Sequence, residues 1–217
     1  MFFPIRDDIP HRKPPVTNYL LIAANIVVFV LQVKSGPAAY QYAAVPSQVV
    51  HGHQLYTVLT SMFMHGGIAH ILSNMWFLWI FGDNVEDAFG HLGYLAVYIA
   101  AGICGATLQI LTTPGSETPM LGSSGAISGV MGAYLVLYPR ARVLTLWPIF
   151  LLSFFNIPAV IYLLLWIGIQ VLFGLATPQS GGGTAFFAHI GGFAFGFMLG
   201  FIARILGRRP QVSYRIR

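Results

Sequence analysis

Residues 185–206 read AFFAHIGGFAFGFMLGFIARIL, and apart from one histidine and one arginine this segment holds only apolar residues and glycine. Such a run can cross a hydrocarbon core, which takes about 20 apolar residues in a helix. At about 100° per residue, Gly192, Gly196 and Gly200 project within roughly 60° of His189. The sequence therefore predicts a membrane helix with one face that lacks bulky side chains and carries an ionisable residue.

A second segment, residues 122–138, reads GSSGAISGVMGAYLVLY and has a matching face. Gly125, Gly129 and Gly132 form a glycine stripe beside Ser124 on the expected helix. Helices with glycine faces approach one another more closely than helices faced with leucine. We expect the glycines of both segments to serve as structural supports, and their contact to bring Ser124 within reach of His189.

These residues have two interpretations on the sequence alone. In the structural one, a serine caps the helix, the glycines pack, and His189 is a buried histidine. In the functional one, the Ser124 hydroxyl lies at a helix N-terminus, where free backbone N–H groups can hold an oxyanion. His189 would then accept the hydroxyl proton near neutral pH.

The composition identifies a membrane protein. The chain has 217 residues, of which 56% are hydrophobic and only 8% are charged, and its mean hydropathy is +0.73. A soluble domain would be about 25% charged. We therefore predict an all-α membrane protein whose single domain covers residues 1–217, with short tails at about 1–15 and 207–217. Six segments are predicted to form a bundle of transmembrane helices: 16–33, 68–81, 93–111, 124–138, 158–176 and 185–206.

The distribution of Lys and Arg predicts the orientation, because loops on the cytoplasmic side collect these residues. With six spans and both termini in the cytoplasm, only Lys34 falls on the outer side. The net charge of +5 then reflects topology and attraction to anionic lipid headgroups. No nucleic-acid partner is expected.

A third group of polar residues surrounds the start of the second span. His70 and Asn74 are four residues apart and share a helix face, so their N–H groups could complete an oxyanion site opposite the Ser124 backbone N–H. Structural hydrogen bonding is the alternative for both of them, and also for His65. A metal site built from the histidines is not predicted, because there is no HExxH motif and no acidic or cysteine ligand close by in the sequence.

Four motifs in the same order resemble those of the rhomboid family of intramembrane serine proteases, in particular the compact six-helix type of bacteria and archaea. They are HGGIAHILSN (65–74), GDNVE (82–86), GSSGAISG (122–129) and AHIGGFAFG (188–196). The resemblance implies that Ser124 is the nucleophile and His189 the general base. It also implies an oxyanion hole of His70, Asn74 and the Ser124 N–H, with Glu86 as a structural support at the cytoplasmic end. We expect His65 to be a structural support as well, through hydrogen bonds to loop backbone.

The resemblance further implies an endopeptidase that cleaves transmembrane segments of other membrane proteins, without a cofactor, in the inner or plasma membrane of a prokaryote. Its partners would be these substrates and the bilayer; no oligomeric state is predicted. Some relatives stack a tyrosine on the catalytic histidine where this chain has Ser128. A non-proteolytic membrane chaperone or transporter that uses the same polar cavity is the alternative function.

The acidic residues predict a catalytic dyad rather than a triad. Of the six Asp and Glu residues, only Glu117 is expected on the outer side with Ser124. It lies in a turn-like loop that contains Pro114, Gly115 and Pro119, and an exposed carboxylate would orient the His189 ring poorly.

Overall fold

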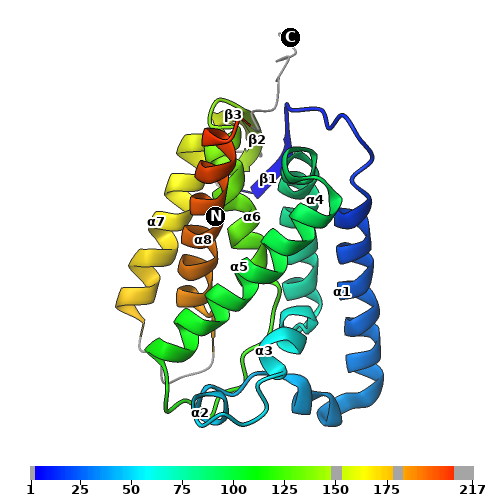
Figure 1. Cartoon of the computed structure of the whole chain (residues 1–217), viewed down its shortest axis with the longest axis vertical. Coiled ribbons are helices and arrows are strands. Elements are labelled where there is room, and N and C mark those ends of the chain that lie inside the picture. The colour runs from blue at the N-terminus through cyan, green and yellow to red at the C-terminus, as the bar shows by residue number, and fades with distance from the viewer. Residues whose placement is uncertain (1–2, 148–152, 178–182, 208–217) are drawn as a thin grey trace.

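The computed structural model describes residues 3–147, 153–177 and 183–207, and most of them are helical. A helix lies over each of the six predicted segments, and with one exception the ends agree to within two residues (Figure 1). By length and composition, four stretches of the described residues can cross a membrane: Val16–Tyr42, His91–Thr112, Ala159–Ala176 and Phe186–Ile205. The long helices are α1 (Val16–Ser35), α4 (Ile68–Phe89), α5 (His91–Thr112), α6 (Ser124–Leu137), α7 (Ala159–Ala176) and α8 (Phe186–Ile205).

The exception is α4, which the sequence predicts to end at residue 81 but which continues to Phe89. Its last two turns contain Asp83, Glu86 and Asp87, so apolar character alone misses them. Asn84 and Glu86 are nevertheless buried, because neighbouring segments cover this end of the helix. The GDNVE motif therefore belongs to α4 and does not follow it.

Short helical turns close one end of the bundle, shown at the bottom of Figure 1. They connect α1 to α4 and pack against the loop that precedes α6, where Ala44 pairs with Met120 in an isolated antiparallel bridge. The turns are η1 (Gly36–Tyr42), α2 (Pro46–Val50), α3 (Thr57–Thr60) and η2 (Ser61–Phe63).

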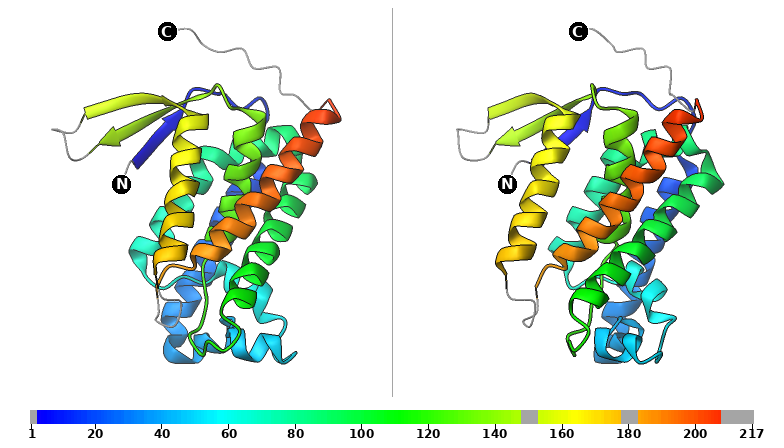
Figure 2. Two further views of the ribbon diagram at one scale, coloured as in Figure 1. Left: turned by 90° about the vertical axis from the view of Figure 1, so that its left-hand side faces the viewer. Right: turned by 60° about the vertical axis from the view of Figure 1, so that its left-hand side comes forward.

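The fold is mostly helical, as predicted, but a three-stranded antiparallel sheet that the sequence analysis did not predict lies at the opposite end. It consists of β1 (Phe3–Asp7), β2 (Arg142–Trp147) and β3 (Ser153–Pro158), in the order β1-β2-β3. Figure 2 shows the sheet extending sideways from the bundle near the start of α7. The first strand lies in the predicted N-terminal tail, and its partner follows about 140 residues later, a pairing that no local pattern reveals. Residues 208–217 of the predicted C-terminal tail lie outside the described residues.

Helix α6 occupies the centre of the bundle and packs against α8 through backbone atoms. A Cβ atom on Gly192 would collide with the carbonyl oxygen of Gly125, and one on Gly196 would collide with that of Gly129. A Cβ on Gly129 would also meet the Cβ of Ala101 on α5. The glycine contact predicted from the sequence is thus present, and it includes a third helix.

Glu86 connects three helices. Its carboxylate accepts hydrogen bonds from the backbone N–H groups of Thr17 at 2.9 Å and Asn18 at 2.8 Å, at the start of α1. Pro15, which precedes this helix, provides no side-chain cap of its own. The same carboxylate binds Nδ1 of His91 at the start of α5. Because a negative charge also favours a helix N-terminus, Glu86 holds α1 and α5 against the end of α4.

The close α6–α8 contact can be tested with two matched alanine substitutions. Gly196→Ala is expected to lower the free energy of unfolding by about 2 kcal/mol or more, because the added methyl group meets backbone that cannot rotate away. Gly125→Ala is the control, since a Cβ there lies 3.4 Å from the nearest atom, an ordinary contact. Unfolding in detergent measures both variants, and equal losses would contradict the account.

Asp7, at the end of β1, fastens the sheet to the bundle. Its Oδ2 accepts hydrogen bonds from the Tyr134 hydroxyl on α6 and, at 2.9 Å, from Nδ2 of Asn84 on α4. Burial raises the pKa of Asp7 from 3.8 to about 7. The folded chain therefore retains a proton that the unfolded chain releases, so the contribution of this group to stability is complete below pH 3.8 and falls as the pH rises to about 7.

Asp7→Asn is expected to remove this part of the pH dependence, because an amide has the same shape and does not ionise. The melting temperature of the variant relative to the unmodified chain should rise between pH 5 and pH 8. Thermal unfolding at both pH values measures the difference in melting temperature between the two chains. Groups that titrate in both chains do not contribute to this difference. A difference that is the same at both pH values would show that Asp7 does not titrate in this range.

Candidate active site

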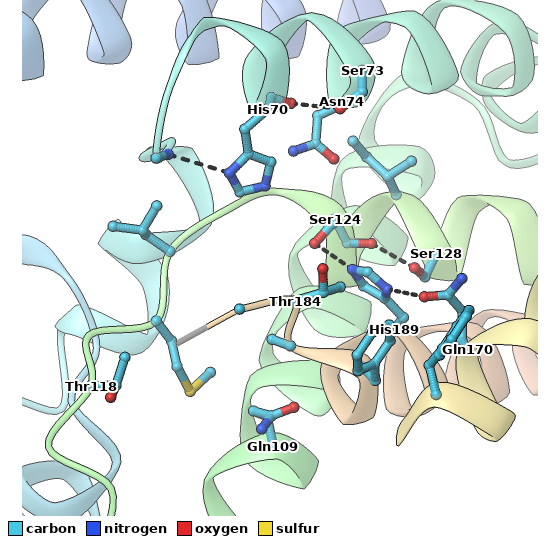
Figure 3. A pocket seen from close by; sticks show the side chains of 18 of the residues that line it. His70, Ser73, Asn74, Gln109, Thr118, Ser124, Ser128, Gln170, Thr184 and His189 are labelled. Carbon is cyan, nitrogen blue, oxygen red and sulfur yellow. Dashed lines mark hydrogen bonds between the residues drawn. The ribbon is translucent and has the colours of Figure 1, made fainter. Parts of the chain in front are cut away.

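A cavity of about 750 Å³ lies between α4, α6, α7 and α8, near the end of the bundle that the short turns close. Figure 3 shows polar side chains from all four of these helices directed toward it. Within the described part of the chain, no Asp, Glu, Lys or Arg lines the cavity. The cavity therefore contains polar side chains but no charged one among the described residues while its histidines are neutral.

Ser124 begins α6 and faces the cavity. Gly122, with φ at 131°, turns the chain into the helix in a conformation that favours glycine. Ser123 is fully buried on the other side, 3.2 Å from Nε2 of His65, and its side chain does not cap α6. The first N–H groups of α6 therefore have no side-chain cap, and they lie beside the Ser124 hydroxyl.

His189 on α8 contacts polar atoms through both ring nitrogens. Its Nε2 lies 2.8 Å from the Ser124 Oγ, and its Nδ1 lies 2.8 Å from Oε1 of Gln170 on α7. The Trp166 ring packs beside the imidazole, with centroids 5.7 Å apart. The structure thus brings together the two residues that the sequence predicts as nucleophile and base.

The sequence analysis did not identify Gln170 and Trp166. Gln170 stands out within an otherwise apolar helix, AVIYLLLWIGIQVLFGLA, and a polar residue at membrane depth is itself a signal of a functional site. That signal was available in the sequence. The contact of Gln170 with His189 was not, because it depends on how α7 lies against α8.

His70 and Asn74 on α4 face Ser124 across the cavity. The backbone N–H of Gly66 donates to Nδ1 of His70 at 3.2 Å, so in the neutral ring the proton is on Nε2. A Cβ built on Gly122 would lie 2.9 Å from that Nε2 and 3.7 Å from the Ser124 Oγ, so both atoms border the same small volume. Nδ2 of Asn74 is buried without a hydrogen-bond partner among the described residues.

His65 lies outside the cavity lining and connects segments behind it. Its backbone N–H donates to Oε1 of Gln32 at 3.0 Å, and Nε2 of Gln32 donates to the His65 carbonyl at 2.7 Å. With its ring beside Ser123, this fully buried histidine joins α1 to the start of α6. The described residues contain no group of three or more His, Cys, Asp or Glu side chains that could hold a metal ion.

Glu117 is exposed and does not line the cavity. The groups that surround Ser124 are consequently one imidazole acceptor and several N–H donors. A serine hydroxyl in contact with an imidazole can be deprotonated as it attacks an electrophilic carbon. Donors aimed at the same volume can stabilise the oxyanion that such an attack produces. The arrangement is suited to acyl transfer.

Sequence comparison relates the chain to known proteins. Residues 52–205 match the model of the family described as the Rhomboid domain. The chain is 33% identical over 168 residues to RHOMBOID-like protein 1 of Arabidopsis thaliana. The aligned residues make up 77% of the chain and 39% of the plant protein. The chain is 35% identical over 173 residues to RHOMBOID-like protein 6, mitochondrial, of the same plant, covering 77% and 48%.

A bacterial relative is the Rhomboid protease GluP of Bacillus subtilis, which is 33% identical over 126 residues. That match covers 56% of the chain and 24% of the bacterial protein. The chain thus spans about half, or less, of the length of these relatives.

Proposed function

The chain belongs to the rhomboid family, and on that premise we propose that it is a serine endopeptidase that hydrolyses peptide bonds in transmembrane segments of other proteins. It is an integral, multi-pass membrane protein. The proposal includes six spans with both termini in the cytoplasm, in the inner or plasma membrane of a prokaryote.

The observation that carries the proposal is the 2.8 Å contact between the Ser124 Oγ and the His189 Nε2 at the edge of an uncharged cavity. In the first step, His189 takes the hydroxyl proton while the Ser124 oxygen forms a bond to the carbonyl carbon of the substrate. In the next, the C–N bond breaks and His189 gives the proton to the leaving amine. Water then attacks the acyl-enzyme with the same base and releases Ser124.

The negative oxygen of each tetrahedral intermediate needs donors that are already in place. Nε2–H of His70, Nδ2–H of Asn74 and the backbone N–H of Ser124 would supply them. The unpartnered Asn74 nitrogen supports this role, because a buried donor without an acceptor is costly unless a ligand supplies one. The positive end of the α6 dipole acts in the same direction.

The proposed nucleophile and base can be tested in liposomes that contain a tagged single-span substrate. Ser124→Ala and His189→Ala are each expected to abolish cleavage while the chain still folds, whereas Ser123→Ala and Glu117→Gln retain most of it. A serine-directed fluorophosphonate should label Ser124 in the active chain. Labelling without cleavage of any substrate in a broad panel would favour another use of the cavity, and cleavage by Ser124→Ala would exclude the proposed mechanism.

The proposed oxyanion donors predict a different pattern. His70→Ala or Asn74→Ala should each slow turnover by roughly 100- to 1000-fold, the effect expected from loss of one donor, while folding is preserved. Added EDTA should leave cleavage unchanged. An effect of these substitutions confined to the yield of folded protein would make both residues structural, and zinc-dependent recovery after EDTA would overturn the serine mechanism.

A further inference from the structure

Gln170 is the hydrogen-bond partner of His189 on the side of the ring away from Ser124. It comes from α7, and only 5% of it is exposed. Its Oε1 lies 2.8 Å from the His189 Nδ1. The catalytic steps proposed above need a particular state of this ring: a neutral imidazole must carry its proton on Nδ1 so that Nε2 can accept one from Ser124.

The orientation of the Gln170 amide follows from its second contact. The other terminal atom lies 3.4 Å from the backbone carbonyl oxygen of Trp166, one turn earlier in α7. A carbonyl oxygen only accepts hydrogen bonds, so the atom beside it must be the amide nitrogen. The amide oxygen then faces His189.

This orientation determines the tautomer of His189. Because the amide oxygen also only accepts, the hydrogen bond at Nδ1 requires the proton to be on that nitrogen. Nε2 of the neutral ring is then unprotonated and is the atom that meets the Ser124 hydroxyl at 2.8 Å. The hydrogen bonds thus form a series with fixed donors and acceptors, from the Trp166 carbonyl through Gln170 and His189 to Ser124.

No Asp, Glu, Lys or Arg among the described residues that line the cavity could do the same. Among the described cavity residues, the titratable side chain that faces His189 is His70, across the cavity on α4. The Trp166 ring flanks the imidazole and restricts its tilt but offers no acceptor to Nδ1. A neutral amide orients the ring without the cost of burying an isolated carboxylate.

We propose that Gln170 is a positioning residue, which holds His189 in the Nδ1–H tautomer and thereby makes α7 part of the catalytic assembly. The effect of Gln170 on catalysis rests on the proposed function, but the tautomer of His189 can be observed without any substrate.

The experiment is 15N NMR of the full chain, labelled at its seven histidines, in detergent. The His189 signals are identified as those that His189→Ala removes. The unmodified chain should show an unprotonated Nε2 and a protonated Nδ1. Gln170→Met, which keeps the length of the side chain but has no acceptor, should give a mixture of tautomers.

Gln109→Met is the matched control. Gln109 is also a buried glutamine that borders the cavity, but its Oε1 accepts from the backbone N–H of Phe187 at 3.1 Å. This substitution should lower the thermal stability and leave the His189 signals unchanged. Gln170→Glu should keep the Nδ1–H tautomer, because a carboxylate oxygen accepts the same hydrogen bond, and it serves as the deciding variant if Gln170→Met does not fold.

In the cleavage assay, Gln170→Met should reduce kcat by about 100-fold with KM unchanged, the lower end of what a positioned base contributes. Gln170→Glu should recover most of that loss. A protonated Nε2 in the unmodified chain, an unchanged tautomer in Gln170→Met, or a mixture of tautomers in Gln170→Glu would each overturn the proposal. Absence of cleavage by the unmodified chain would count against the proposed function only, since the NMR result still decides the role of Gln170.

Discussion

The contact between the glycine faces of α6 and α8 is the constraint on which the rest of the structure depends. In a lipid environment, helices gain little from burying apolar side chains against one another, so close packing and small residues hold them together. Glycines at 192 and 196 allow backbone atoms of α8 to approach carbonyl oxygens of α6. This close approach also allows the 2.8 Å contact between Ser124, the first residue of α6, and His189 in the first turns of α8.

Because α6 is only 14 residues long and almost entirely buried, it needs other helices around it rather than lipid. Polar side chains at the ends of the bundle hold those helices in place. Glu86 caps α1 and binds the start of α5, and Asp7 joins the sheet to α4 and α6. At the cavity, by contrast, Asn74 presents a donor without a partner. Among the described residues, the unpaired Asn74 nitrogen is the buried donor that borders the cavity, where the proposed function needs a donor for a substrate oxygen.

The cavity lies among apolar helices, and none of the described residues that line it carries a fixed charge. Moving an unpaired carboxylate into such a site is expensive, whereas amides and neutral imidazoles are satisfied by one or two hydrogen bonds. Gln170 and His70 follow this rule. The direction of each hydrogen bond is set by an atom that can only donate or only accept, such as the Gly66 N–H or the Trp166 carbonyl.

The sequence by itself determined the membrane class, the positions of the long helices and the pairing of Ser124 with His189. The first two can be read from composition and apolar length, and the third from two segments that each carry glycines spaced by turns beside a reactive side chain. Only the tertiary structure decided the β1–β2 pairing, the continuation of α4 through Glu86, and the contact of Gln170 with His189. These depend on where distant segments lie relative to one another, because a strand needs a partner and a buried carboxylate needs donors from other helices. The way in which α7 lies against α8 brings the Gln170 amide, 19 residues earlier in the chain, to the His189 ring.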